Sequence, residues 1–445
     1  MEKNLTRGFP AKLILGFAFP LLIGNLFQQI YGVINTLIVG RFLGVEALAA
    51  VGCTGGILFF IIGFIQAMAS GFAIVTAQAY GARQKQGVRN SFCISLTLGA
   101  MVSVALTLAA TFFAHDILEL LDTPAAILEP AHSYIIVIYR GIPATILFNL
   151  LSSSILALGD SRPPLLFLMI ACIINILLDF LFILGFGWGV SGASTATVLA
   201  QLTASALCLV YIMRRVPALR LRRKDWVMSA ASLWRSARIG LPMGFQASTV
   251  AIGAIILQWA LNGLGKNPVA AFTVARTIDM VAILPMASFG LAMATYVGQN
   301  YGAGAIDRIR QGVRHCCAIS LLFSVMVGLM NIFGGTHLIG FFVGEGQEEV
   351  TRLAQTFLTI NASMYWVLAL LFIFRFSLQG LGKSLVPTLA GFVELAMRGG
   401  AAVMLTQSYG FIGACVSNPL AWVGACIPLA AAYMYTIRKL SGAPG

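Results

Sequence analysis

Seven ionisable side chains lie inside long apolar stretches of the sequence. They are Arg140, Asp179, Arg276, Asp279, Arg375, Glu394 and Arg398. A charged group in apolar surroundings is costly, so each of them is a candidate functional residue. Arg276 and Asp279 are three positions apart, which places them on one helix face. Glu394 and Arg398 are four positions apart and share a face in the same way. Such pairs are typical of self-neutralising structural contacts.

Asp179 has no partner on its own helix, so its neighbours must come from other elements. At about 1.5 Å per helical residue, Asp179, Thr197 and Asn35 each lie about 8–9 Å below the outer end of their helix. Asn175 lies one turn below Asp179 on the same face. One carboxylate among amide and hydroxyl oxygens suits a proton relay or a hard cation such as Na⁺. The alternative is a fixed salt bridge to Arg140, which lies about 14 Å deep and within long-side-chain reach.

The composition indicates which solvent surrounds these groups. Of the 445 residues, 59% are hydrophobic and 10% are charged, whereas soluble domains have about 45–50% and about 25%. This apolar excess is accepted by a bilayer. The net charge of +13 comes from short loops between apolar spans, which is a topology signal and excludes a nucleic-acid groove.

We expect an all-α membrane protein with twelve transmembrane helices, each long enough for a hydrocarbon core of about 30 Å. The predicted spans are residues 13–40, 47–78, 91–114, 131–158, 164–185, 191–213, 237–262, 268–297, 313–334, 352–380, 386–406 and 411–436. The segments on the side of the N-terminus carry nearly all Lys and Arg residues, whereas the opposite side carries Arg41, Lys266 and Arg352. This asymmetry predicts a multi-pass inner (plasma) membrane protein with both termini in the cytoplasm.

Short motifs recur in the two halves of the chain. QAYGA at 78–82 matches QNYGA at 299–303, and LGDSRPP at 158–164 matches LGKSLVP at 381–387. The spacing of about 220–225 positions predicts a duplication into two pseudo-symmetric lobes of six helices. We expect an N-terminal lobe at 1–213, a cytoplasmic linker at 214–236 and a C-terminal lobe at 237–445. The basic linker is expected to lie on the inner leaflet and to contact anionic lipid.

Several of these segments together resemble the multidrug and toxic compound extrusion (MATE) family. The resemblance covers nearly the whole chain and rests on NTLIVGRFLGVEALAAVG at 35–52, the QxYGA repeats, LGDSRPP, and NILLDFLFILGFGWGVSGASTATV at 175–198. GLPMGFQ at 240–246 and ARTIDMVAILP at 275–285 look most like the DinF-like branch. The resemblance implies a V-shaped fold and cation-coupled export of organic, often cationic, compounds.

The resemblance also implies roles for the polar residues of the first lobe. Asn175, Asp179 and Thr197 match the N-lobe cation site of relatives. The departure is Asn35, where relatives usually have aspartate, so a single carboxylate favours protonation of Asp179 over tight Na⁺ binding. Pro20 removes a backbone hydrogen bond in the middle of the first helix. It is either a static kink or the position where this helix bends.

The second lobe departs from relatives that place coupling carboxylates on their seventh and tenth helices. This chain has Gln246 and Gln258 on the seventh helix and Arg375 on the tenth, so that coupling site is expected to be absent. The predicted substrate pathway consists of Gln246, Glu394, Arg398 and Arg140. For Gln246, a hydrogen bond to a neighbouring helix is the alternative to a contact with substrate.

These features predict a secondary active antiporter that exports a small organic compound, cationic or amphipathic, in exchange for H⁺ or Na⁺. The sequence contains no GxxxxGK[ST] phosphate loop, so ATP is not expected to drive transport. The four histidines form no HxxxH pair, which argues against a metal-dependent membrane enzyme. We expect no cofactor, no resident metal and a monomer in lipid. The alternative is a flippase of lipid-linked or amphipathic anionic substrates in the same superfamily.

Overall fold

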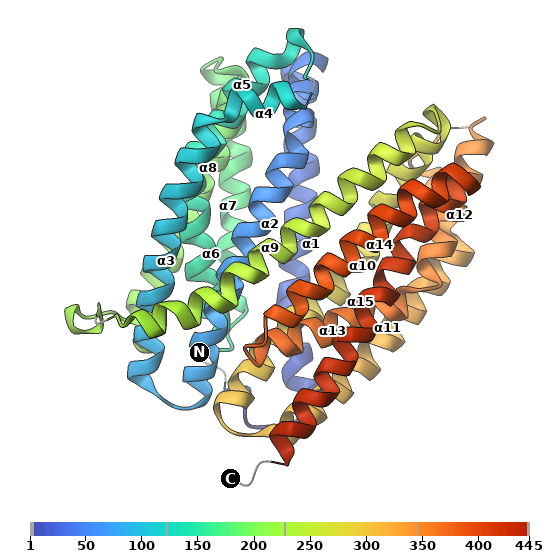
Figure 1. The fold of residues 1–445 in the computed structure, drawn as a ribbon. Coiled ribbons are helices and arrows are strands. Elements are labelled where there is room, and N and C mark those ends of the chain that lie inside the picture. Colours follow the sequence, from blue (N-terminus) through green and yellow to red (C-terminus); the bar gives the residue numbers. More distant parts are fainter. Residues whose placement is uncertain (1–3, 122, 227, 345, 443–445) are drawn as a thin grey trace. The chain divides into compact units, whose positions relative to one another are not determined.

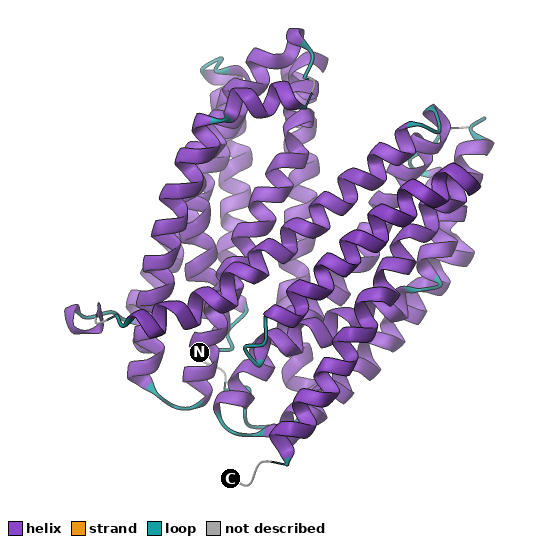
Figure 2. Ribbon diagram, viewed as in Figure 1, coloured by secondary structure: helices purple, strands orange, loops and turns teal. Residues whose placement is uncertain are grey.

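The computed structural model describes residues 4–121, 123–226, 228–344 and 346–442, and this part of the chain holds helices and no strand (Figures 1 and 2). The α-helices are α1 (Pro10–Leu43), α2 (Val45–Gly81), α3 (Lys85–Phe112), α4 (Ala114–Leu120), α5 (Ala125–Arg140), α6 (Ile142–Ala157), α7 (Arg162–Phe180), α8 (Gly189–Arg215), α9 (Ala230–Asn262), α10 (Lys266–Gly302), α11 (Ile306–Gly340), α12 (Glu348–Ala362), α13 (Tyr365–Gly380), α14 (Leu385–Tyr409) and α15 (Phe411–Ser441). A π-helical turn, Leu181–Gly185, follows α7, and two 3₁₀ turns, Pro217–Leu219 and Arg223–Trp226, lie between α8 and α9.

Among the described residues, ten helices are long and apolar enough to cross a membrane. Two further spans are bent pairs: α5 with α6 meet at 44°, and α12 with α13 meet at 48°. Each pair is the fourth span of its half, so the repeat extends to the bend itself. The prediction of an all-helical membrane protein is confirmed, with ten to twelve spans according to how the bent pairs are counted.

The helices form two compact units that divide the chain differently from the predicted lobes. The first unit contains Pro20–Gly244, and the second contains Leu5–Phe19 together with Phe245–Gly445. Two helices therefore change unit along their length. In α1 the change comes between Phe19 and Pro20, and in α9 it comes two residues after Pro242. The start of α1 therefore packs in the second unit, and the start of α9 packs in the first. The sequence repeat does not indicate this packing.

The sequence repeat is reproduced in the backbone at two pairs of glycines. Gly44 before α2 and Gly265 before α10 have φ angles of 87° and 98°. Gly159 and Gly382, in the LGDS and LGKS motifs, have φ angles of 83° and 77°. Left-handed backbone strains any residue with a Cβ. Equivalent turns in the two halves thus require the same residue.

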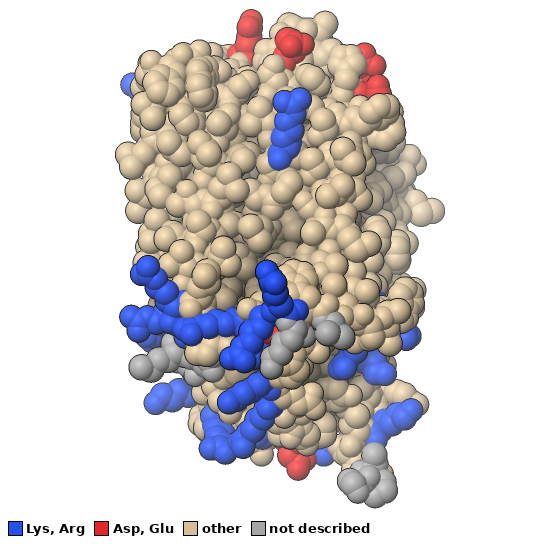
Figure 3. Space-filling view, turned by 90° about the vertical axis from the view of Figure 1, so that its left-hand side faces the viewer, with Lys and Arg blue, Asp and Glu red and all other residues tan. Residues whose placement is uncertain are grey.

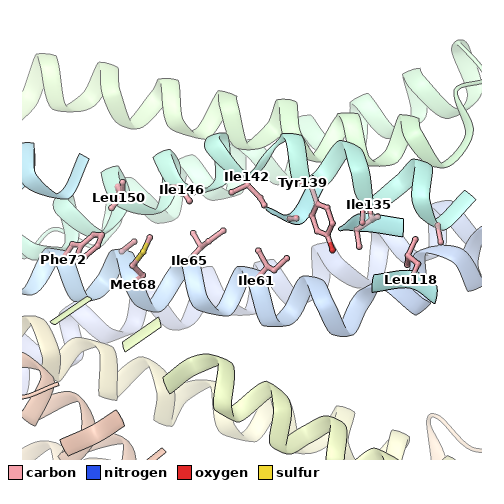
Figure 4. Close-up of a cluster of buried hydrophobic side chains, with 14 of the residues drawn as sticks. Ile61, Ile65, Met68, Phe72, Leu118, Ile135, Tyr139, Ile142, Ile146 and Leu150 are labelled. Carbon is pink, nitrogen blue, oxygen red and sulfur yellow. The ribbon is translucent and has the colours of Figure 1, made fainter. Parts of the chain in front are cut away.

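One core cluster of the first unit is an apolar seam that includes α2, α5 and α6 (Figure 4). Ile61, Ile65 and Met68 of α2 face Ile142 and Ile146 of α6 in this seam. Their spacing of three and four residues places them on one helix face. Small residues elsewhere let helices approach closely: a Cβ on Gly99 would overlap a methyl group of Leu150. A separate cluster joins Ile38 of α1, Tyr134 of α5 and Ala193 of α8.

The second unit has its own core, in which α10 and α12 pack through Phe272 and Phe357 with ring centroids 5.3 Å apart. Many large apolar side chains outside both cores are exposed, for example Leu322 at 74% and Phe333 at 78% on α11. A soluble monomer rarely exposes apolar surface so extensively. The outer surfaces of these helices are therefore suited to lipid.

Charged side chains are distributed unevenly along the molecule. On the face drawn in Figure 3, Lys and Arg gather toward one end and the acidic groups lie mostly toward the opposite end. The turn from α2 to α3 carries Arg83 and Lys85. The segment after α8 adds Arg220 and Arg222. The band between the two ends is almost free of charge, as expected for a surface inside a bilayer.

Candidate functional site

Asp179 lies in the last turn of α7, immediately before the π-helical turn Leu181–Gly185. π-Helical turns inside helices frequently occur at functional sites. The side chain is 0% exposed, and neither carboxylate oxygen has a hydrogen-bond donor among the described residues. An ionised carboxylate left in this state costs several kcal/mol. The arrangement therefore favours a protonated carboxyl group or a bound cation.

Asn175 and Thr197 join α7 to α8 beside this carboxylate. The Asn175 Nδ2 donates a hydrogen bond to the Thr197 Oγ1 at 3.2 Å. The Tyr31 hydroxyl of α1 lies 3.4 Å from the same Thr197 oxygen. Thr197 in turn donates to the backbone carbonyl of Ala193 at 3.1 Å. Residues from three helices are thus held at one level.

The side-chain oxygens in this region outnumber the donors available to them. The Asn175 Oδ1 and the Asn35 Oδ1 are buried and accept no hydrogen bond from any described residue. Asn35 lies one turn after Tyr31 on α1, and the Tyr31 hydroxyl lies against the Thr197 oxygen. Carboxylate and amide oxygens are ligands that Na⁺ and similar hard cations accept. The donor set therefore fits either a proton on Asp179 or a hard monovalent cation.

Arg140 does not take the place of that cation. It is exposed at the C-terminal end of α5, and the described residues contain no ion pair between Arg140 and Asp179. The alternative of a fixed salt bridge between Arg140 and Asp179 is therefore not seen in the described residues.

The second unit contains a different kind of polar centre, built on Glu394 of α14. The Glu394 Oε2 accepts from the Arg375 Nη2 at 2.5 Å, and the Oε1 accepts from the Arg398 Nη2 at 2.7 Å. All three side chains are buried, with exposures of 4–6%. The side-chain amides of Gln246 and Gln379 lie 2.8 Å apart. When the Gln246 side-chain oxygen is turned toward Arg375, it accepts hydrogen bonds from the Arg375 Nε and Nη1, both at 3.1 Å. Glu394 is therefore fully paired, in contrast to Asp179.

Asp279 is the second buried carboxylate of this unit, and its partner differs from the predicted one. It accepts a hydrogen bond from the Tyr365 hydroxyl, which itself accepts from the Asn331 Nδ2 at 3.1 Å. The described residues show no ion pair between Asp279 and Arg276, although the two charges interact at longer range. Helical spacing alone overstated this pair, because a neighbouring helix supplied a closer donor.

The structure brings together the predicted Asn175 and Thr197, and it joins Glu394 to Arg398. Gln246 contacts Arg375, which in turn pairs with Glu394. Sequence reasoning missed Tyr31, whose hydroxyl lies 3.4 Å from the Thr197 oxygen. It also missed Tyr134, which is buried with Ile183 and Ala193. The position of Tyr31, one turn before Asn35, was the available signal. The link from Arg375 to Glu394 joins two helices, and no spacing rule indicates such a contact.

Comparison with known proteins identifies the class to which this architecture belongs. Residues 20–181 and 242–399 match the family model described as MatE. The probable multidrug resistance protein YoeA of Bacillus subtilis is 27% identical over 380 residues, which is 84% of this chain and 81% of the relative. The DNA damage-inducible protein F of Escherichia coli is 24% identical and covers 78% of this chain and 75% of its own.

Two further comparisons extend this result. The FAD transporter of Shewanella oneidensis is 22% identical, over 87% of this chain and 86% of the relative. A solved structure described as the outward-facing conformation of a multidrug resistance MATE family transporter of the MOP superfamily has a TM-score of 0.92. It is 22% identical and covers 99% of this chain and 98% of that chain. The chain belongs to the MatE family, and it is a multi-pass membrane transporter rather than an enzyme.

Proposed function

We propose that this protein is a secondary active antiporter that exports small organic compounds across the plasma membrane in exchange for H⁺ or Na⁺. Asp179 is the residue that carries or releases the coupling ion, and Asn175, Thr197 and Asn35 complete its surroundings. The observation that carries this proposal is the buried Asp179 carboxylate without a donor, beside other oxygens in the same state. A buried carboxylate with no cationic partner among its described neighbours is suited to bind a proton or a cation reversibly.

Membership of a family that contains multidrug export proteins supports the exporter class. The concentration of basic side chains at one end supports the topology with both termini in the cytoplasm. The relatives do not separate the DinF-like branch from the others, since proteins of several names match to a similar extent. Assignment to that branch, the monomeric state and a positive charge on the substrate stay predictions.

A second candidate is the flipping of lipid-linked or amphipathic anionic substrates. The feature that favours it is a surplus of guanidinium groups over carboxylates in the apolar middle parts of the second unit's membrane-spanning helices, which hold Arg276, Arg375 and Arg398 but only Asp279 and Glu394 as acids. The flippase would use the same coupling site at Asp179 as the antiporter. The two candidates differ in the charge of the substrate that the second unit would bind.

The test is transport in proteoliposomes with two fluorescent probes, an organic cation and flavin mononucleotide, under separately imposed H⁺ and Na⁺ gradients. We expect one gradient to drive at least one probe in the wild type, and Asp179→Asn to abolish the driven component. Asp116→Asn removes an exposed carboxylate on α4 of the same unit and serves as the matched control. Transport by neither gradient would overturn the antiporter assignment, and normal coupling in Asp179→Asn would overturn the role of that residue.

A further inference from the structure

An apolar layer covers one side of the polar residues around Asp179. It is a cluster of side chains that pack against one another and come from α1, α5, α8 and the π-helical turn after α7. Its members are Ile38, Val39, Tyr134, Ile183, Val190 and Ala193. All six are between 0% and 9% exposed. The Tyr134 hydroxyl is the one polar side-chain group among these six residues, so the layer is almost entirely hydrocarbon.

The layer lies about one helical turn away from the polar site. On α8, Ala193 precedes Thr197 by four positions, and its backbone carbonyl accepts a hydrogen bond from the Thr197 hydroxyl at 3.1 Å. Ile183 follows Asp179 by four positions, across the start of the π-helical turn. Residues three or four positions apart lie on one helix face. The layer and the site are therefore stacked along the same helices.

The direction of this stacking can be read from α1 and α8. On α1, Ile38 follows Asn35 by three positions, toward the C-terminal end of the helix. α8 begins beside the layer and ends at Arg214 and Arg215. The layer thus lies on the side of the site that faces away from these two arginines. In the proposed topology this is the outer side of the membrane.

Three aromatic rings pack at the connection between α7 and α8, next to the layer. Phe182 and Trp188 stack with ring centroids 4.8 Å apart, and the Phe186 ring lies 5.5 Å from that of Trp188. The Trp188 backbone N–H donates to the Phe182 carbonyl at 2.9 Å. A Cβ on Gly192 would come within 3.1 Å of the Phe182 Cβ, so a glycine permits this approach. Phe182 is 7% exposed and Trp188 is 50% exposed, so the stack leads from the buried layer to the surface.

We propose that the apolar layer and the Phe182–Trp188 stack form an outer seal of the ion-coupling site. A hydrated or charged species crosses apolar side chains only at a high desolvation cost, and hydrophobic constrictions close pathways in this way. Phe182 and Ile183 both lie in the π-helical turn, where the backbone departs from the regular helix. Movement of this turn opens the seal. The inference rests on the proposed function of Asp179 and names the residues that separate its carboxylate from the outer aqueous phase.

The test is carbodiimide labelling of Asp179 in the detergent-solubilised full chain, measured by mass spectrometry. A water-soluble carbodiimide reports access from the aqueous phase, whereas dicyclohexylcarbodiimide also enters from the micelle. In the wild type, the water-soluble reagent should label Asp179 at least about tenfold more slowly than the exposed Asp116. Ile183→Ala should accelerate this labelling of Asp179 by about tenfold, because lost packing makes local opening more frequent. Ile183→Leu keeps the apolar volume and should retain the slow rate.

Two further variants keep the test independent of general loosening. Trp188→Ala alters a half-exposed side chain, so the protein should fold, and labelling of Asp179 should again be faster. Ile155→Ala is the matched control, because it makes the same substitution in a separate apolar cluster of the first unit and should leave the rate unchanged. The seal is overturned if Asp179 and Asp116 react equally in the wild type, or if Ile183→Ala has no effect. It is also overturned if Ile155→Ala acts as strongly, or if both carbodiimides gain equally in Ile183→Ala.

Labelling requires no ion gradient, so its outcome is separate from that of the coupling experiment. Faster labelling in Ile183→Ala together with normal coupling in Asp179→Asn would keep the seal and overturn the coupling role of Asp179. Lost coupling in Asp179→Asn together with unchanged labelling in Ile183→Ala would keep the antiporter and overturn the seal.

Discussion

The side-chain oxygen of Gln299 accepts a hydrogen bond from the backbone N–H of Leu5, at 2.9 Å and across 294 positions of sequence. Gln299 is the first residue of the QNYGA motif. In the other motif, QAYGA, the equivalent Gln78 accepts from the Arg235 Nη2 at 3.0 Å. The two repeated glutamines thus have the same role, because each anchors the segment at the start of α1 or α9 to the unit that contains the motif.

The anchor in the second unit is reinforced by Arg308. Its Nη2 donates to the backbone carbonyl of Gly8 at 2.9 Å, and its Nε donates to the Asn300 Oδ1 at 3.1 Å. Asn300 also donates to the carbonyl of Leu5 at 3.3 Å. These bonds explain why Leu5–Phe19 belongs to the second unit although the rest of α1 belongs to the first.

The first prediction concerns this anchor. Gln299→Leu should accelerate hydrogen exchange of the Leu5 amide by about fivefold, because one buried hydrogen bond contributes about 1 kcal/mol to local protection. Hydrogen–deuterium exchange followed by mass spectrometry measures the effect at residues 4–13. Gln78→Leu is the matched control and should act instead on the segment around Arg235. Equal changes at both segments in either variant would contradict separate anchors.

The second prediction concerns the missing carboxylate of the first unit. Asn35→Asp places a second acid one turn after Tyr31, on the helix face that adjoins the Asp179 site. Two carboxylates attract a hard cation more strongly than one. We therefore expect the Na⁺ concentration for half-maximal transport, or for half-maximal Na⁺ binding, to fall by about tenfold.

Isothermal titration with NaCl in potassium-containing buffer measures this change directly. Asn35→Leu has no oxygen and should not gain affinity for Na⁺. An Asn35→Asp variant that binds Na⁺ no better than the wild type would show that position 35 lies outside the coupling site.

Depth along each helix is readable from sequence, whereas contacts between helices are not. Counting residues from the helix ends brought Asn175 and Thr197 to one level, and a hydrogen bond joins them in the structure. The same counting could not show that Arg375 turns toward Glu394, because that depends on the angle at which α13 meets α14. For the same reason the four-residue spacing of Glu394 and Arg398 identified a true ion pair but missed its third member.

In the fold, likewise, the helices follow from local sequence, whereas the assignment of a segment to a unit depends on long-range contacts. Apolar spans predicted the helices, since this signal lies along the chain. The transfer of Leu5–Phe19 to the second unit depends on long-range bonds such as that of Arg308 to Gly8. Pro20 marks the position of that change, although a proline in a sequence does not reveal whether its helix changes partners.

The third prediction concerns the energetic role of Glu394. Glu394→Gln removes the carboxylate that pairs with both Arg375 and Arg398, and two buried positive charges then remain. Breaking a buried ion pair in this way typically costs roughly 3–5 kcal/mol, so the variant should unfold at a clearly lower temperature or denaturant concentration. Thermal unfolding in detergent measures this loss. Asp307→Asn breaks the exposed pair with Arg310, at 3.8 Å, and should cause no measurable change. A stable Glu394→Gln protein would contradict the charge pairing described here.

The fourth prediction compares two glycines in neighbouring helices. A Cβ on Gly413 would overlap the backbone oxygen of Leu405, where neither α14 nor α15 has a flexible atom to move. Gly413→Ala should therefore lower stability by about 1–3 kcal/mol or more, as overpacking does. Gly400 on α14 meets nothing within 4 Å. Gly400→Ala should raise stability by about 0.5–1 kcal/mol, because alanine loses less conformational freedom in a helix. Opposite shifts of the unfolding temperature are expected in one detergent. A rise in both variants would show that helix propensity outweighs the close approach of α14 to α15, and a fall in both would contradict the open space at Gly400.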